Sequence, residues 1–162
     1  MIRNVQVHDA EDICNIYNYY IQNSVVTFEE DIITIDQMIE RIQKISSKYP
    51  YIAYELDGQV VGYAYASTWR TRSAYRYCVE STVYVHRDYM SRGIGSKLYE
   101  ELIRSLGKLE IHNIMGVIAL PNPQSVKLHE KLGFYKAGHF KEVGRKFDKW
   151  IDIGYWQYDF NK

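Results

Sequence analysis

The sequence predicts one mixed α/β (α+β) domain that spans residues 1–162. Asp57-Gly58 separates two runs of β-branched and aromatic residues, which is the pattern of a tight antiparallel hairpin. The run VYVHRDYMSRGIGSK (83–97) passes from a strand through a glycine turn into a helix. From residue 113 onward strand and helix signals alternate again, which indicates a sheet flanked by helices.

Two amphipathic helices are expected near the N-terminus. Asp9 is expected to cap the first helix, whose apolar residues recur every three or four positions over 13–21. Thr34 and Gln37 form the pattern of a capping box that opens the second helix. The polar and aromatic segment 23–31 between these helices is expected to be a loop.

The strands are expected in the centre and in the C-terminal part of the chain. The hairpin accounts for 51–56 and 59–67, and a third strand, 77–85, ends at the glycine turn. A short buried strand follows at 113–120, and the aromatic tail from 134 to 160 is expected to form two more.

Two further helices are expected in the second half of the chain. One begins at the glycine turn and is closed by Gly107. The other begins at Asn122-Pro123, the favoured order of cap and first helical residue, and ends at Gly133.

The composition favours a small-molecule partner. Twenty basic and twenty acidic residues cancel, so no net field attracts nucleic acid or an anionic membrane. Cys14 and Cys78 match neither a metal-binding pattern nor a disulfide framework. No apolar signal core or membrane span of roughly 18 apolar residues occurs, so we expect a cytoplasmic location and no metal.

The glycine turn has the features of a site for a phosphorylated ligand. Gly93 and Gly95 let the backbone approach a ligand closely, and the helix that follows offers free N–H donors at its positive end. The spacing differs from a dinucleotide fingerprint, which would need a third glycine at Leu98, and it lacks the Lys-Ser/Thr ending of a P-loop. An ordinary strand-to-helix connection is the alternative.

These motifs resemble the GCN5-related N-acetyltransferase (GNAT) superfamily. The resemblance extends to its phosphinothricin and methionine sulfoximine (sulfone) N-acetyltransferase branch through TFEE (27–30), VVGYAYAS (60–67), VESTVYV (79–85), LHEKLGF (128–134) and GHFKEVGRKFDKWID (138–152). It implies a mostly antiparallel sheet of about six or seven strands flanked by helices, acetyl-CoA as cosubstrate and a homodimer. The tail aromatics Phe147, Trp150, Tyr155 and Trp156 could cover a partner's sheet or belong to the core.

The resemblance also implies how acetyl-CoA is bound. Unpaired backbone groups of Val83, Tyr84 and Val85 are expected to pair with the pantetheine arm like an added strand. Backbone amides of the turn are expected to hold the pyrophosphate. The predicted cofactor residues beyond the strand are Ser91, Arg92, Gly93, Ile94, Gly95, Ser96, Asn122, Ser125 and Lys131. Met90 departs from the superfamily pattern, which has Gln or Arg at this position.

Two residues are predicted to be catalytic. Glu80 is the expected general base, because burial beside apolar residues would raise its pKa toward the working range. His129 stands where the superfamily has a tyrosine, and it is a candidate for protonating the leaving thiolate. A solvated carboxylate for Glu80 and a core role for His129 are the alternatives.

The resemblance places the substrate amine between the early loop and the strand of Glu80. Paired guanidiniums bind carboxylate or phosphinate oxygens in fork geometry, so an amino-acid analogue would suit the arginine loop. The predicted substrate residues are Phe28, Glu29, Arg70, Thr71, Arg72, Glu80, Ser81 and Thr82. Two alternatives stay open: a non-catalytic acyl-CoA-binding or sensing module, and a peptide or protein N-terminal acetyltransferase.

Overall fold

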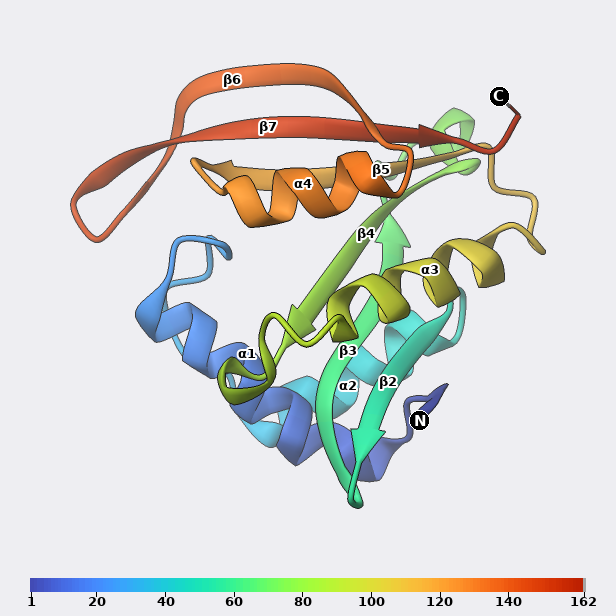
Figure 1. Cartoon of the computed structure of the whole chain (residues 1–162), viewed down its shortest axis with the longest axis vertical. Coiled ribbons are helices and arrows are strands. Elements are labelled where there is room, and N and C mark those ends of the chain that lie inside the picture. The colour runs from blue at the N-terminus through green and yellow to red at the C-terminus, as the bar shows by residue number, and fades with distance from the viewer. Residues whose placement is uncertain (162) are drawn as a thin grey trace.

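A computed structural model describes residues 1–161 and contains one seven-stranded sheet (Figure 1). The sheet order is β1-β2-β3-β4-β5-β7-β6, and every pair is antiparallel except β4 with β5. The predicted fold class is therefore confirmed. The elements are β1 (Ile2–Asn4), α1 (Ala10–Asn23), α2 (Ile35–Ser46), β2 (Tyr51–Leu56), β3 (Gln59–Thr68), β4 (Cys78–Val85), α3 (Ile94–Leu106), β5 (Asn113–Leu120), α4 (Pro123–Lys131), β6 (Tyr135–Lys146) and β7 (Lys149–Asp159).

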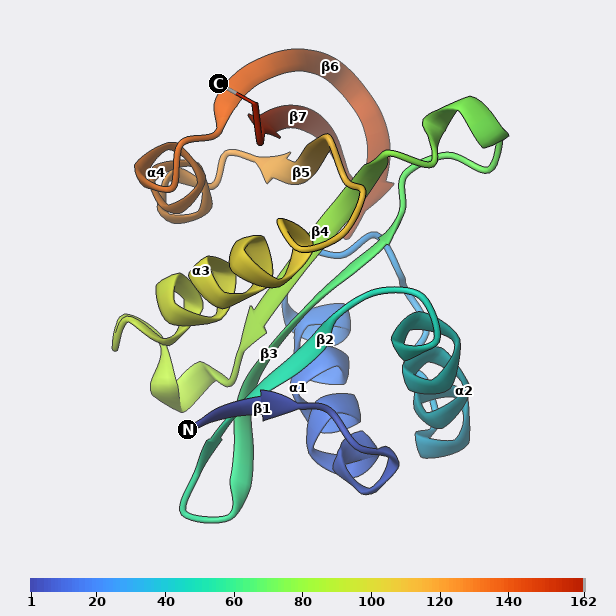
Figure 2. The same ribbon diagram turned by 90° about the vertical axis from the view of Figure 1, so that its right-hand side faces the viewer.

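Helices cover both faces of the sheet. Helices α1 and α2 lie on one face, and α3 and α4 lie on the other (Figure 2). Each face has its own core, with Ile13 and Tyr63 buried in the first and Leu98 and Leu102 in the second. Burial of such side chains contributes roughly 1.5–3 kcal/mol each. Strand β4 is thus held between two packed layers.

Short-range signals are reproduced closely. Asp57 and Gly58 have φ angles of 51° and 81°, which is the pair of left-handed conformations that a type I′ hairpin turn needs. The Thr34 and Gln37 side chains form both bonds of the predicted capping box. Asn122 caps α4 by accepting a hydrogen bond from the Ser125 N–H at 3.1 Å.

The N-terminal segment differs from the prediction in two respects. Residues 2–4 form β1, because they pair with β2 at the edge of the sheet. Asp9 directly precedes α1, but its carboxylate does not cap that helix. It instead binds the Arg3 guanidinium, with both N–O distances at 2.8 Å, and accepts from the Gln6 N–H at 2.7 Å. The paired bonds to the guanidinium are stronger than a bond to one backbone N–H of the helix, which favours this arrangement.

The two tail strands form a long hairpin whose aromatic residues divide between core and surface. Trp156 is buried, whereas Phe147 and Trp150 are exposed. Among residues 1–161, no helix combines the length and apolar character needed to cross a bilayer.

Candidate active site

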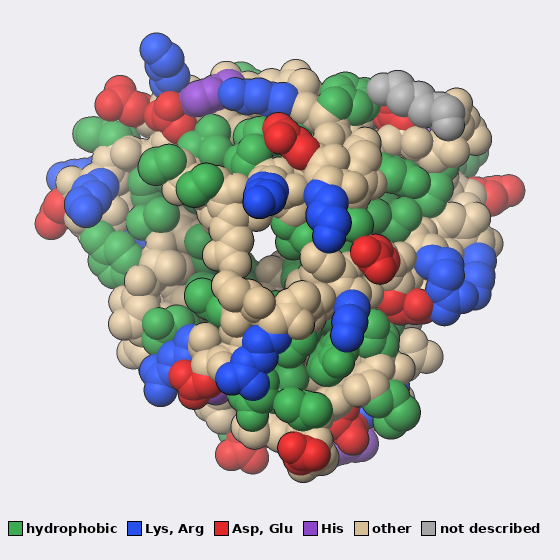
Figure 3. All heavy atoms as spheres, viewed as in Figure 1, with side chains coloured by type: hydrophobic (Ala, Val, Ile, Leu, Met, Phe, Trp, Pro, Cys, Tyr) green, Lys and Arg blue, Asp and Glu red, His purple; other side chains and the backbone are tan. Residues whose placement is uncertain are grey.

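The central feature of the site is the place where β4 and β5 separate. The two strands pair from Cys78 with Asn113 to Ser81 with Gly116, and not beyond. Strand β4 continues beside β3, and β5 continues beside β7. Figure 3, drawn in the orientation of Figure 1, shows a hole through the molecule beneath α4 and beside β4. The separation therefore leaves one edge of the end of β4 unpaired, facing the hole.

Backbone groups of β4 line this edge. Hydrogen-bonding direction alternates along an antiparallel pair, and the His86 N–H donates to the Val61 carbonyl of β3 at 2.8 Å. The backbone N–H and C=O of Tyr84 therefore also point to β3. The backbone N–H and C=O of Val83 and Val85 point to the opening. The Val85 carbonyl accepts from the Tyr20 hydroxyl at 2.6 Å, a contact for which the sequence holds no signal.

The glycine turn next to this edge has the geometry of an anion site. Ser91 and Gly93 adopt left-handed φ angles of 61° and 77°, and Gly93 is the N-cap of α3. The first bond within the helix runs from the Lys97 N–H to the Gly93 carbonyl at 3.1 Å. The N–H groups of residues 94–96 thus precede the helical ladder and are available to a ligand.

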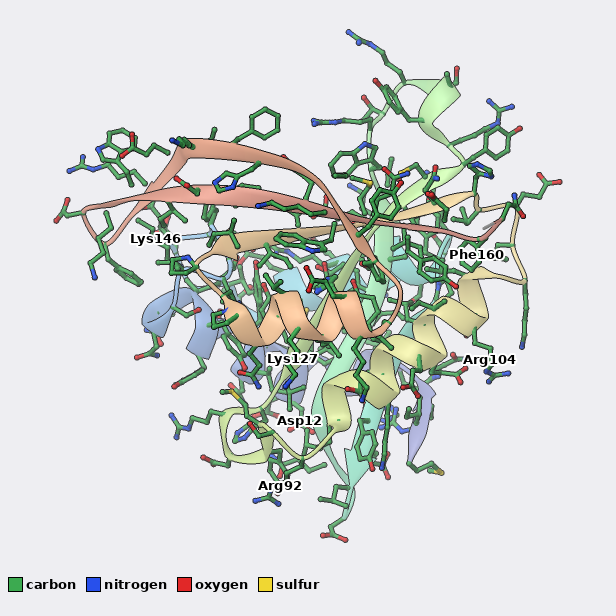
Figure 4. All side chains as sticks on the ribbon, turned by 45° about the horizontal axis from the view of Figure 1, so that its top comes forward. Asp12, Arg92, Arg104, Lys127, Lys146 and Phe160 are labelled. Atoms are coloured by element: carbon green, nitrogen blue, oxygen red, sulfur yellow. The ribbon has the colours of Figure 1, made fainter. Side chains whose placement is uncertain are left out.

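Basic and amide side chains come from the turn and from α4. The Arg92 guanidinium lies over the Tyr89 ring, 4.9 Å from its centroid, and is exposed. Lys127, which the sequence did not single out, extends from α4 (Figure 4). The cap occupies the Asn122 oxygen, so its N–H groups are the part able to contact a ligand. Lys131 is exposed at the last residue of α4, the end opposite Asn122.

Glu80 lies half-buried on β4, one residue before the last pair with β5. Burial raises the pKa of Glu80 above its usual range, and the positive charge of Arg70 partly opposes the shift. Within the described part of the chain, no donor or ion-pair partner contacts this carboxylate. The geometry is that of a base with a raised pKa and a free lone pair.

Glu80 and Thr82 face the same side of β4, toward α1 and α2. Tyr65 lies against Thr82, and the charges of Glu80, Glu29 and Arg41 all act on its phenol. Ser81 points to the opposite side and is only 7% exposed, so its side chain does not join the other predicted substrate residues. The structure therefore brings Glu80 and Thr82 together as one side of the predicted amine pocket.

The early loop brings Glu29 into that pocket. Arg41 on α2 holds both oxygens of the Glu29 carboxylate, at 2.8 and 2.5 Å, and the Tyr17 hydroxyl also donates to it. These bonds lower the pKa of Glu29, with the Arg41 hydrogen bonds as the largest cause. Glu29 is therefore an anion held in one orientation.

The β6–β7 hairpin holds the same loop from the other side. Lys146, at the hairpin end in Figure 4, is 3% exposed and donates to the Thr27 carbonyl at 2.9 Å. Phe28 packs directly on Gly144 of β6, where a Cβ would overlap its ring. Tyr17, Arg41 and Lys146 were not singled out from the sequence, because each acts on a segment far along the chain.

The arginine loop lies on the surface. Arg70 stacks on Trp69, with 4.8 Å between the guanidinium carbon and the ring centroid, and its charge reaches Glu80. Thr71 and Arg72 are exposed, and Arg72 precedes the turn at 73–75. Of the two predicted arginines, Arg70 is the one brought close to the base.

His129 lies in the core at the vertex of the opening. Its Nδ1 is 2.7 Å from the Ser125 carbonyl and its Nε2 is 2.9 Å from the Tyr99 hydroxyl. Burial lowers the pKa of His129. Both ring nitrogens are engaged, and protonation of a thiolate by His129 stays a prediction.

The cysteines offer no nucleophile. Cys14 is buried and donates to the Ile33 carbonyl at 3.3 Å. Cys78 borders a shallow hollow of about 590 Å³ at the start of β4 and β5, away from the glycine turn. Burial raises the pKa of Cys78 to about 11, so a thiolate is scarce there at neutral pH.

A splayed strand pair beside an amide-rich helix start is the arrangement of an acyl-CoA acyltransferase. Comparisons with known proteins agree. The sequence matches the acetyltransferase (GNAT) domain over residues 2–154. The chain therefore belongs to the GNAT acetyltransferase family.

Two relatives with named substrates match this chain over nearly its whole length. Phosphinothricin N-acetyltransferase from Streptomyces viridochromogenes is 39% identical over 98% of this chain and 87% of the relative. The L-methionine sulfoximine/L-methionine sulfone acetyltransferase of Salmonella typhimurium is 31% identical over 96% of this chain and 92% of the relative.

Solved structures have the same fold. The yncA protein of Salmonella typhimurium, solved with its cofactor acetyl-CoA, has a TM-score of 0.98, at 29% identity, over 100% of this chain and 94% of its own. A GNAT superfamily phosphinothricin acetyltransferase from Sinorhizobium meliloti, in complex with AcCoA, has a TM-score of 0.95, at 34% identity, over 98% of this chain and 87% of its own.

Proposed function

We propose that this protein transfers the acetyl group of acetyl-CoA to the α-amino group of a small amino-acid analogue of the phosphinothricin, methionine sulfoximine or methionine sulfone type. The observation that carries the proposal is the half-buried carboxylate of Glu80 beside the vertex of the β4/β5 opening. Relatives with these substrate names, 31–39% identical, support the substrate class.

The residues around the β4/β5 opening fit acetyl-CoA, which donates the acetyl group. Acetyl-CoA supplies an acetyl group already activated as a thioester. The amides of residues 91–96 suit its pyrophosphate, and the open groups of Val83 and Val85 suit the amides of its pantetheine arm. The Val85 carbonyl accepts from the Tyr20 hydroxyl with one lone pair, and its second lone pair can accept from a ligand amide.

Glu80 serves as the general base, directly or through a water. An α-amino group with a pKa near ~8 is neutral in only about one molecule in ten at pH 7, so a positioned base increases the reactive fraction. Direct attack on the thioester follows, because neither cysteine is poised as a nucleophile. A thiolate with a pKa of about 8.5 can leave without a protein acid.

Release of the CoA thiol over a panel of amines tests this function. We expect turnover with phosphinothricin or methionine sulfone, and little with a peptide N-terminus. Efficient peptide turnover would instead indicate a peptide acetyltransferase. If acetyl-CoA binds in calorimetry and no amine is acetylated, the chain is a binding module and the enzyme proposal fails.

Arg70→Met is expected to change both substrate affinity and pH dependence. Losing the guanidinium should raise KM for an amine with an acidic group by roughly 10-fold, as for a lost charge-assisted bond. Removing a positive charge also raises the pKa of Glu80, so the acid limb of the kcat/KM profile should move to higher pH. Arg76→Met, in the same loop but bonded to Tyr77, is the matched control. An unshifted acid limb in Arg70→Met would contradict the assignment.

A homodimer and a cytoplasmic location stay predictions. The exposed aromatics of the β6–β7 hairpin, Phe140, Phe147 and Trp150, are 54%, 52% and 62% exposed and provide the surface on which the dimer is proposed. Light scattering after size exclusion would determine the oligomeric state.

A further inference from the structure

A buried chain of hydrogen bonds crosses the vertex of the β4/β5 opening. It runs from the Ser81 hydroxyl on β4 to the Tyr99 hydroxyl on α3, and on to His129 and the Ser125 carbonyl on α4. Ser81 also lies 3.3 Å from the Met115 carbonyl of β5. Three side chains thus link β4, α3 and α4 by hydrogen bonds and contact β5.

The chain lies at the last residue pair before the strands separate. Ser81 pairs with Gly116, and the His129 imidazole lies directly on Gly116. A Cβ on Gly116 would be 2.5 Å from the Cδ2 and Nε2 atoms of that ring. Gly116 does not have a left-handed φ, so glycine is needed here to leave room for the imidazole and not for its backbone conformation. The imidazole therefore fills the vertex itself.

The direction of each proton can be assigned. The Ser125 carbonyl only accepts, so His129 Nδ1 carries a hydrogen. Burial lowers the pKa of the imidazole, which leaves Nε2 as an acceptor. Tyr99 then donates to Nε2. The single Ser81 hydrogen goes to the Tyr99 oxygen, the shorter of its two contacts, and not to the Met115 carbonyl at 3.3 Å. Each hydroxyl hydrogen of the chain is then assigned to one acceptor.

We propose that Tyr99 is a positioning residue of the acetyl-transfer site. It holds Ser81 and His129 at the vertex in this single proton arrangement, and so fixes the point at which β4 leaves β5. The backbone groups of Val83 and the carboxylate of Glu80 are displaced if that point moves. This role rests on the proposed acetyl transfer.

Tyr99→Phe tests the proposal. We expect kcat to fall about 10- to 100-fold, as for a small misplacement of reacting groups, with KM for acetyl-CoA within about three-fold of wild type because the turn amides are intact. Tyr158→Phe is the matched control, because its ring packs on the same Phe134 at 5.4 Å outside the chain. Both are assayed well below their melting temperatures. A melting temperature that falls while kcat stays within two-fold of wild type would mean that Tyr99 only stabilises the fold, and would overturn the proposal.

Imidazole ¹⁵N–¹H spectra give a readout that turnover does not affect. Wild-type His129 should show a protonated Nδ1 and a bare Nε2 at neutral pH, and Tyr99→Phe should raise its pKa by removing the donor to Nε2. A wild-type Nε2–H signal would overturn the assignment. Ser81→Ala removes only the end of the chain, so a kcat loss of a few fold is expected there even if Tyr99→Phe does not fold. If wild type acetylates no amine, the proposed function fails, and the spectra still decide the proton arrangement.

Discussion

Replacing Glu80 with glutamine is expected to lower kcat by about 10²-fold or more at neutral pH. The amide keeps the shape of the carboxylate and loses its basicity, so the amine must lose its proton without help. As pH rises toward the amine pKa of ~8, the free amine becomes abundant and the loss should shrink. Steady-state rates from pH 6 to 10 measure this directly. Parallel wild-type and variant profiles would remove Glu80 from the mechanism.

The stability of the same variant distinguishes lost chemistry from lost folding. Burial raises the folded-state pKa of Glu80 above the unfolded value of about 4.3, so the folded state binds more protons between the two. Wild-type stability therefore falls as pH rises through this window and stays lower above it. Glu80→Gln lacks this cost and should melt at an equal or higher temperature than wild type at pH 7, with the difference vanishing below about pH 4. Glu100→Gln, at an exposed position on α3, is the matched control for both readouts.

Features that arise within a few residues were predictable from the sequence. The hairpin at Asp57-Gly58, the capping box at Thr34 and the cap at Asn122 each involve neighbours along the chain, and each is present. The glycine turn belongs to the same class, because a left-handed residue followed by a helix start fixes where the free amides point.

Features that depend on distant segments were not predictable in this way. Lys146 and Thr27 are 119 positions apart, and no local pattern marks a lysine that will be buried. The carboxylate of Asp9 has two competing uses, and only the position of Arg3 in the folded chain decides between them. Tyr99 shares a helix face with Leu102 and Ile103, so its hydroxyl on an apolar face was the available signal that a buried partner exists.

Gly116→Ala is expected to be the most disruptive single-methyl change near the site. The new Cβ would be 2.5 Å from the His129 ring, and that ring is held at both nitrogens. Neither the strand nor the imidazole can move without breaking a buried bond, so a loss of roughly 1–3 kcal/mol or more is expected. Gly138→Ala is the matched strand control, since its Cβ would meet nothing closer than 3.9 Å. Urea unfolding of both variants measures the difference.

A double-mutant cycle identifies the cause of that loss. If the overlap with the imidazole is responsible, Gly116→Ala should cost much less in a His129→Ala background, where the methyl enters the space left by the ring. Residues in contact show coupling energies of about 0.5–3 kcal/mol, and a value near the upper end is expected here. Additive losses would mean that Gly116 is required for a reason other than the histidine. Strong coupling would support a vertex whose width is set by the imidazole lying on a bare backbone, which no side chain at position 116 can reproduce.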